Sequence, residues 1–190
     1  MPFASVRWSS AYLGLPAQMP HPILTKLAGG DRRSIGRANE VVAEVLARPA
    51  LFRVLVEGLT SEDPVVCMRA ADALEKITAR RPELLRPYKN TVLEISGRTR
   101  QREVRWHMAV LLPRMNLRAR ERAVAVRILF DYLDDPSSIV KTFAMQGLAG
   151  LATQDATLRS KIIPLLRKLT DTGTPAMRAR GRKLLAGLAK

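Results

Sequence analysis

The sequence holds one cysteine and two histidines in 190 residues, so few side chains are available for disulfides or metal binding. The lone Cys67 excludes an intrachain disulfide and a zinc site built from cysteines. It fits a reducing compartment, and we expect a cytoplasmic protein. No apolar run approaches the length that crosses a bilayer, so no membrane partner is expected.

Aromatic residues are also scarce, at 5% of the chain, although 47% of the residues are hydrophobic. A β-sandwich would need more Thr, Tyr, Phe and Ile, so a chain rich in Ala, Leu and Val favours helices. Catalytic patterns are missing as well: the sequence has no paired His-Glu metal spacing, no Gly-rich phosphate loop and no nucleophile elbow. We therefore expect no enzyme activity, no cofactor and no metal site.

Acidic residues are outnumbered by basic ones, 17 to 32, which gives a formal net charge of +15. Such an excess attracts polyanions and acidic surfaces, and the planar guanidinium of arginine binds phosphates and carboxylates in a bidentate manner. Residues 1–20 contain one arginine, no acid and no helical apolar stripe. We expect a flexible leader there, with Met19 as an alternative start.

A repeat is visible in the second half of the chain, where Val140–Ala152 and Met177–Ala189 share one apolar skeleton. A nine-residue frame describes both: apolar, basic, two free, small, two free and two apolar. Copies of the frame begin at Ser34, Val66, Val104, Val140 and Met177, at spacings of 32, 38, 36 and 37 residues. The eighth, ninth and twelfth positions are nonpolar in all five copies, as one buried face of a helix requires.

Turn signals containing Gly, Asp or Pro precede four of the copies, and another apolar-periodic stretch precedes each turn. The unit is therefore helix, turn, helix, and a period of this length indicates a repeat architecture. We expect Pro87 and Pro164 to kink or shorten the first helices that contain them, and Pro113 to disturb a second helix near its end. The repeats are expected at about 21–48, 49–81, 82–116, 117–153 and 154–190.

These features resemble the HEAT-repeat family. The residues that carry the resemblance are Asp135-Pro136, Val140-Lys141, Ala144 and Gly147-Leu148, with a second match from Asp63-Pro64 through Val66 and Ala70 to Ala73-Leu74. The third copy departs from the pattern because it lacks Asp-Pro, and Cys67 replaces the expected basic residue. The resemblance implies an all-α fold, a right-handed superhelical α–α solenoid of about five helix pairs, in which the second helices line a concave groove.

Frame positions 4, 7 and 11 lie away from the apolar stripe, so we expect their side chains to face this groove. The Arg37–Glu40 and Arg69–Asp72 spacings predict either local ion pairs or a ladder that accepts a partner's charges. The candidate groove residues at these positions are Arg37, Arg69, Asp72, His107, Arg114, Phe143, Gln146, Arg180 and Lys183.

The segment from Arg98 to Arg122 holds eight arginines and only two acids, Glu103 and Glu121. Arg102, Arg105 and Trp106 lie within it, and arginines beside an aromatic ring can hold a phosphate and stack a base. The segment predicts a nucleic-acid interface only if its arginines converge on one face. Otherwise Trp106 fills the seam between repeats and the arginines solvate two turns.

We therefore expect a non-catalytic scaffold that binds an acidic protein segment or helix in its groove. The alternative is a DNA- or RNA-binding protein that uses the Arg98–Arg122 region and the last helix. Helical-repeat DNA glycosylases have a comparable superhelix, and their resemblance would need a carboxylate near aromatic rings in the groove. Asp72 is the only neighbouring candidate for that carboxylate.

Overall fold

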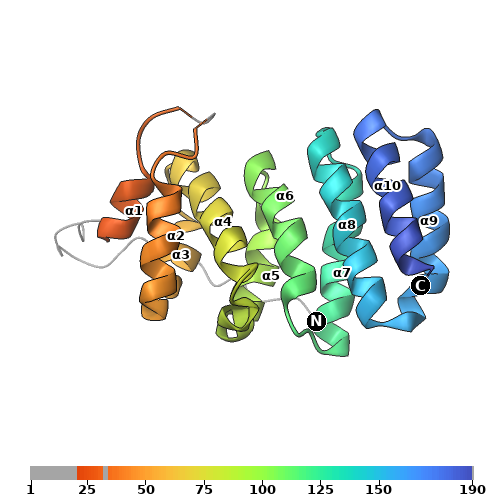
Figure 1. The fold of residues 1–190 in the computed structure, drawn as a ribbon, viewed down its shortest axis with the longest axis horizontal. Helices are drawn as coiled ribbons and strands as arrows, with labels where there is room; N and C mark the ends of the chain where they lie inside the picture. Colours follow the sequence, from red (N-terminus) through yellow and green to blue (C-terminus); the bar gives the residue numbers. More distant parts are fainter. Residues whose placement is uncertain (1–20, 32–33, 190) are drawn as a thin grey trace, which may run out of the picture.

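The computed structural model describes residues 21–31 and 34–189, and these residues form helices joined by short turns (Figure 1). The expected leader and Met19 lie outside the described residues. Short 3-10 segments precede or follow several helices at Pro49–Leu51, Pro82–Tyr88, Leu112–Arg114 and Ala156–Leu158. The α-helices are α1 Pro22–Leu27, α2 Ala38–Ala47, α3 Phe52–Gly58, α4 Pro64–Thr78, α5 Lys89–Arg98, α6 Arg102–Leu111, α7 Ala119–Leu133, α8 Ser138–Gln154, α9 Arg159–Thr172 and α10 Pro175–Leu188.

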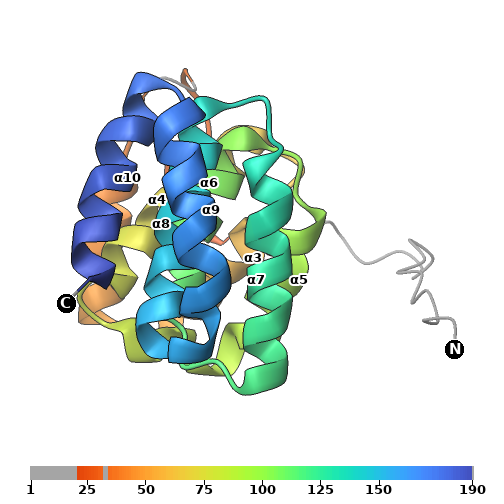
Figure 2. The same cartoon turned by 90° about the vertical axis from the view of Figure 1, so that its right-hand side faces the viewer.

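The helices form two layers that run along the length of the molecule (Figures 1 and 2). The second helices of the pairs, α2, α4, α6, α8 and α10, pack side by side in chain order and form one layer. The first helices, α1, α3, α5, α7 and α9, form the other layer, and each packs against the second helix of its own pair. The described chain is therefore an α-solenoid of helix pairs, as the repeat predicts.

The core follows the frame that the sequence predicts. In the first four copies every residue at positions 8, 9 and 12 is buried, from Val41 to Leu151. In the fifth copy Leu188 is buried, whereas Leu184 and Leu185 are half-buried. No later helix of the described chain packs against α10, so its apolar stripe is covered less completely.

Prolines and polar residues set the helix ends, with some shifts from the expected places. Asp63 caps α4, because its carboxylate accepts a hydrogen bond from the Val65 amide at 2.8 Å and Pro64 occupies the first turn. Pro136 does not open α8, which begins at Ser138. Pro87 lies in a 3-10 segment and delays the start of α5 to Lys89, whereas Pro164 lies inside an uninterrupted α9.

Gly147 lies at a close approach of two second helices. A Cβ atom at this position would lie 2.7 Å from the carbonyl oxygen of Ala109 in α6 and 2.9 Å from Leu129 Cδ2 in α7. Both distances are too short for a real contact, and a backbone carbonyl cannot rotate away as a side chain can. The glycine at this position therefore allows α6 and α8 to pack at backbone contact.

We expect Gly147→Ala to lower the free energy of unfolding by about 1–3 kcal/mol, the usual cost of overpacking a close contact. The matched control is Gly187→Ala in α10, where nothing lies within 4 Å of the added methyl group. That substitution should leave stability unchanged or raise it by up to about 1 kcal/mol, since alanine favours helix over glycine. Urea unfolding of both variants measures the difference, and equal midpoints would contradict the close packing.

Candidate binding surface

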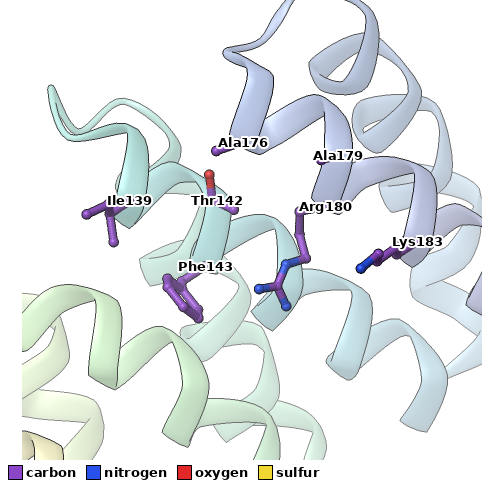
Figure 3. Close-up of a pocket in the computed structure, with 7 residues that line it drawn as sticks. All are labelled: Ile139, Thr142, Phe143, Ala176, Ala179, Arg180 and Lys183. Atoms are coloured by element: carbon purple, nitrogen blue, oxygen red, sulfur yellow. The ribbon is translucent and has the colours of Figure 1, made fainter.

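An open groove of about 440 Å³ lies between α8 and α10 (Figure 3). Ile139 and Phe143 project from α8, and Arg180 and Lys183 project from α10. Ile139 is 53% exposed, although isoleucine is among the residues most often fully buried. Small residues separate the apolar side from the cationic side, so the groove stays open. Its lining residues are Ile139, Thr142, Phe143, Ala176, Ala179, Arg180 and Lys183.

Three side chains from successive second helices form a row beside this groove, which we call the aromatic–arginine row: Trp106, Phe143 and Arg180. The Trp106 and Phe143 ring centroids are 5.0 Å apart, and Arg180 Cζ lies 5.6 Å from the Phe143 centroid. The Arg180 guanidinium also donates a hydrogen bond to the Gln146 side-chain oxygen. The cation is thus held in place before any ligand arrives, which limits the conformational entropy that binding would cost.

Arg69 does not face the concave groove that the second helices were expected to line, so the prediction for this residue is wrong. Its side chain is 2% exposed, and its guanidinium lies under the loop that joins α1 to α2. Buried carbonyl groups need donors, and one arginine supplies several of them here. The carbonyl oxygens that accept from Arg69 are those of Leu27 at 2.9 Å, Gly29 at 2.6 Å, Asp31 at 3.1 Å and Ser34 at 3.0 Å.

The two predicted local ion pairs have different outcomes. Arg37 and Glu40 form the expected pair, 2.7 Å apart and exposed, so that prediction is confirmed. Asp72 instead pairs with Lys76 at 2.7 Å, and Lys76 also donates to the Asn39 side chain at 3.0 Å. Arg37 therefore lies on the exposed surface of the first pair, away from the aromatic–arginine row, while Asp72 is held within α4.

Arg105 is also buried, so its predicted place in a binding face is wrong. It donates to Asp135 Oδ2 at 2.6 Å and to Asp131 Oδ2 at 2.9 Å, and both carboxylates belong to the following repeat. Its guanidinium lies over the Tyr132 ring, 4.7 Å from the centroid. Burial raises the pKa of the Tyr132 hydroxyl well above its usual value. Arg105 thus joins the third repeat to the fourth.

His107 and Arg114 converge on Glu75 of the preceding repeat. His107 is 2% exposed, and its Nδ1 lies 2.7 Å from Glu75 Oε2, while its ring stacks on Trp106. Arg114 donates to the Glu75 carbonyl oxygen at 2.6 Å and to the Thr78 hydroxyl at 3.0 Å. Burial opposes ionisation of Glu75, but His107 and the neighbouring cations outweigh it, so the pKa of this carboxyl lies below its usual value. Burial also lowers the pKa of Arg114, against the opposing effect of Glu75.

The Arg98–Arg122 segment does not form one arginine face. Arg102 begins α6 and Arg114 follows its end, so the arginines of the segment lie on opposite edges of the helix layer. Several of them already have acidic partners: Arg98 with Glu94 at 2.6 Å, Arg102 with Glu103 at 2.7 Å, and Arg122 with Asp155 at 3.0 Å. The convergence on which the nucleic-acid prediction depends is therefore missing from this segment.

The glycosylase-like arrangement is not formed at the groove either. Its lining includes no acidic side chain, and the Asp72 carboxylate is engaged by Lys76. Among residues 21–31 and 34–189, no three His, Cys, Asp or Glu side chains are grouped so that they could hold a metal ion. The groove therefore offers apolar contact and positive charge.

Charge is distributed unevenly along the solenoid. Residues 34–88 carry eight basic and eight acidic side chains, whereas residues 156–189 carry eight basic side chains and one acid, Asp171. The groove lies at the basic end, since α10 supplies two of its lining cations. An anionic ligand would meet the strongest positive potential there.

Ile139 is the groove residue that the sequence analysis missed, together with Thr142, Ala176 and Ala179. It precedes the first position of the frame, where the third copy carries Glu103. Its apolar side chain outside the core stripe is the feature of the sequence that could have indicated a binding residue. Frame positions 4 and 7 do supply four predicted residues that meet beside this groove: Phe143, Gln146, Arg180 and Lys183.

Among the comparisons with known proteins, one solved structure shares the fold of this chain, and the family is left open. No protein-family model matches the chain, and no curated protein matches it. An engineered protein of known crystal structure is 20% identical, with a TM-score of 0.60 over 88% of this chain and 78% of that one. A designed armadillo repeat protein is 16% identical, with a TM-score of 0.43 over 87% of this chain and 98% of that one. The chain has the fold of a helical repeat protein, and membership of the HEAT family stays a prediction.

None of the described helices is both long enough and apolar enough to cross a membrane.

Proposed function

We propose that this chain is a non-catalytic binding protein whose second-helix layer binds an acidic protein segment at the α8–α10 groove. The observation that carries the proposal is the groove itself, where an exposed aliphatic side chain and an aromatic ring face two cations with no acid among the lining residues. A protein segment can supply both apolar and acidic side chains to such a groove. Helical repeat folds present such extended surfaces to their partners.

The aromatic–arginine row supports a protein ligand in particular. Phe143 and Gln146 hold the Arg180 guanidinium in place. Its remaining N–H groups can therefore donate hydrogen bonds to a carboxylate. Ile139 gains nothing from a phosphate backbone, whereas an apolar side chain would remove it from water. Nucleic acid remains the second candidate, because residues 156–189 carry eight basic side chains against one acid.

The test compares acidic polypeptide with nucleic acid at matched length and several salt concentrations. We expect measurable affinity for acidic peptides at about 150 mM salt, where attraction between distant solvent-exposed charges is already screened. Duplex DNA, single-stranded DNA and RNA serve as competitors. Nanomolar binding of one of them with a steep salt dependence would support the nucleic-acid alternative instead.

Two double variants with equal net charge locate the binding site. Arg180→Ala with Lys183→Ala removes two cations from the groove. The outer variant, Arg167→Ala with Lys168→Ala, removes two exposed cations from α9, in the layer of first helices. We expect the groove variant to weaken acidic-peptide binding at least about tenfold and the outer variant less than about twofold. Equal loss in both would show that only net charge matters, which contradicts a defined site.

A pull-down from native lysate, with and without nuclease, complements these titrations. Partners retained after nuclease treatment would be proteins bound directly. Loss of every partner on nuclease treatment would favour the nucleic-acid alternative.

A further inference from the structure

Ile139 stands out among the described residues because only one other large apolar side chain, Ile35, is comparably exposed, at 44% against 53%. Ile139 lies in the first turn of α8, one helical turn before Phe143, and both side chains line the same groove. A side chain from another molecule placed between them would contact both. The groove thus has an apolar subsite at its α8 side.

The opposite side of the groove is cationic. Arg180 and Lys183 are neighbours on one face of α10, three residues apart, and Arg180 extends toward Phe143. Thr142, Ala176 and Ala179 lie between the two sides and leave space because their side chains are short. The ligand that complements this arrangement has a bulky apolar side chain with carboxylates beside it.

We propose that the groove binds an acidic amphipathic segment through one anchor residue, a bulky apolar side chain that enters between Ile139 and Phe143 while neighbouring carboxylates pair with Arg180 and Lys183. This inference rests on the proposed function and adds the apolar anchor to it. The volume of about 440 Å³ suits a few side chains of such a segment.

Charge argues against the other occupants of this groove. A second copy of the chain carries a formal net charge of +15 and would bring further cations to the cationic side. Residues 1–20 contain no acidic side chain, so that segment lacks the carboxylates that the groove would pair. An acidic segment of a different protein meets both requirements.

The experiment selects peptides from a random library of 16-residue sequences displayed on phage, with the full chain as bait at about 150 mM salt, above which surface charge pairs contribute little. We expect enriched peptides to share a bulky apolar residue with at least two acids nearby. Synthetic versions should change the fluorescence of Trp106, which packs on Phe143, in a Trp8→Phe background that removes the only other tryptophan.

Paired substitutions then locate the anchor. Ile139→Ser should weaken the selected peptides by about tenfold or more, the factor that burial of one aliphatic side chain supplies. Replacing the peptide's apolar residue by serine should have the same effect, and combining both changes should add little, because each removes the same contact. Ile139 is exposed, so the variant is expected to fold, and Ile35→Ser is the matched control that should leave binding unchanged.

Each of the other outcomes contradicts either the apolar anchor alone or the proposed function as well. Acidic peptides with no shared apolar residue, or peptides whose affinity is the same for Ile139→Ser, would disprove the anchor and leave the proposed function standing. Enrichment of peptides without acids, or of none above the bait-free background, would disprove both. Self-association of the chain competing with peptide would show that a second copy occupies the groove.

Discussion

Arg105→Met is expected to lower the free energy of unfolding by about 3–5 kcal/mol, since removing one partner of a buried ion pair leaves the other charge uncompensated. Arg105 and Asp135 side chains are each 7% exposed and their charged atoms are 2.6 Å apart. Asp135 could regain solvation only by opening the contact between the third and fourth repeats. Urea unfolding with linear extrapolation measures the loss.

Two companion variants separate the causes. Arg102→Met removes an exposed arginine three residues earlier, paired with Glu103, and should leave the free energy of unfolding nearly unchanged. Adding Asp135→Asn to Arg105→Met should recover part of the loss, because the uncompensated charge is then gone while the cap on Ser137 is kept. A loss below about 1 kcal/mol for Arg105→Met would mean that water already reaches the pair.

Arg69→Met is expected to have the second large effect, confined to one end of the molecule. Its guanidinium supplies charge-assisted hydrogen bonds to the carbonyls of the α1–α2 loop, and such bonds contribute about 1.5–3 kcal/mol each. Because repeats contact only their neighbours, the loss should appear as local opening of the first pair. Amide exchange in α2 should accelerate by about a hundredfold, which corresponds to roughly 3 kcal/mol, while exchange in α8 stays the same.

The control for this prediction is Arg37→Met, which removes an arginine of the first pair that is paired with Glu40 on the exposed surface. Its amide exchange should match that of the unaltered chain. Uniform acceleration along the whole solenoid in Arg69→Met would contradict the local role and indicate a single cooperative unit. Gly36 leaves room for this arginine, since a Cβ at position 36 would lie 2.8 Å from Arg69 Cζ.

The layout of the helices could be predicted because it depends on local pattern. The recurring apolar positions locate one buried stripe for each second helix, and Asp63-Pro64 marks where one of them begins. The exact first residues of the helices are harder to predict from the sequence. Pro136 fits a first turn by its own geometry, yet the cap that Asp135 forms with the Ser137 amide moves the start of α8 to Ser138.

The roles of the arginines could not be predicted from frame position alone. Arg69 and Arg180 share position 4, but one is buried among carbonyls and the other borders the groove. The difference comes from the α1–α2 loop, where Gly29, Gly30 and Gly36 have positive φ angles and turn carbonyls toward Arg69. A side chain's partners are set by such tertiary geometry, which a one-dimensional pattern does not contain.

One pairing was nevertheless present in the sequence. The frame requires a basic residue at its second position, and Arg105 is that residue in the third copy. The Asp-Pro turn precedes the fourth copy, and its Asp135 is the partner of Arg105 in the structure. The second frame position of one copy therefore pairs with the Asp-Pro turn that precedes the next copy.

The uneven charge along the solenoid gives the molecule a permanent dipole moment parallel to its long axis, with the positive pole at α9 and α10. A dipole rotates in the field of an approaching anion before the two surfaces touch. Encounters would therefore begin at the last repeat, next to the groove, and would be productive more often than random collisions. Added salt would slow association more than it speeds dissociation, because this orienting field acts chiefly before contact.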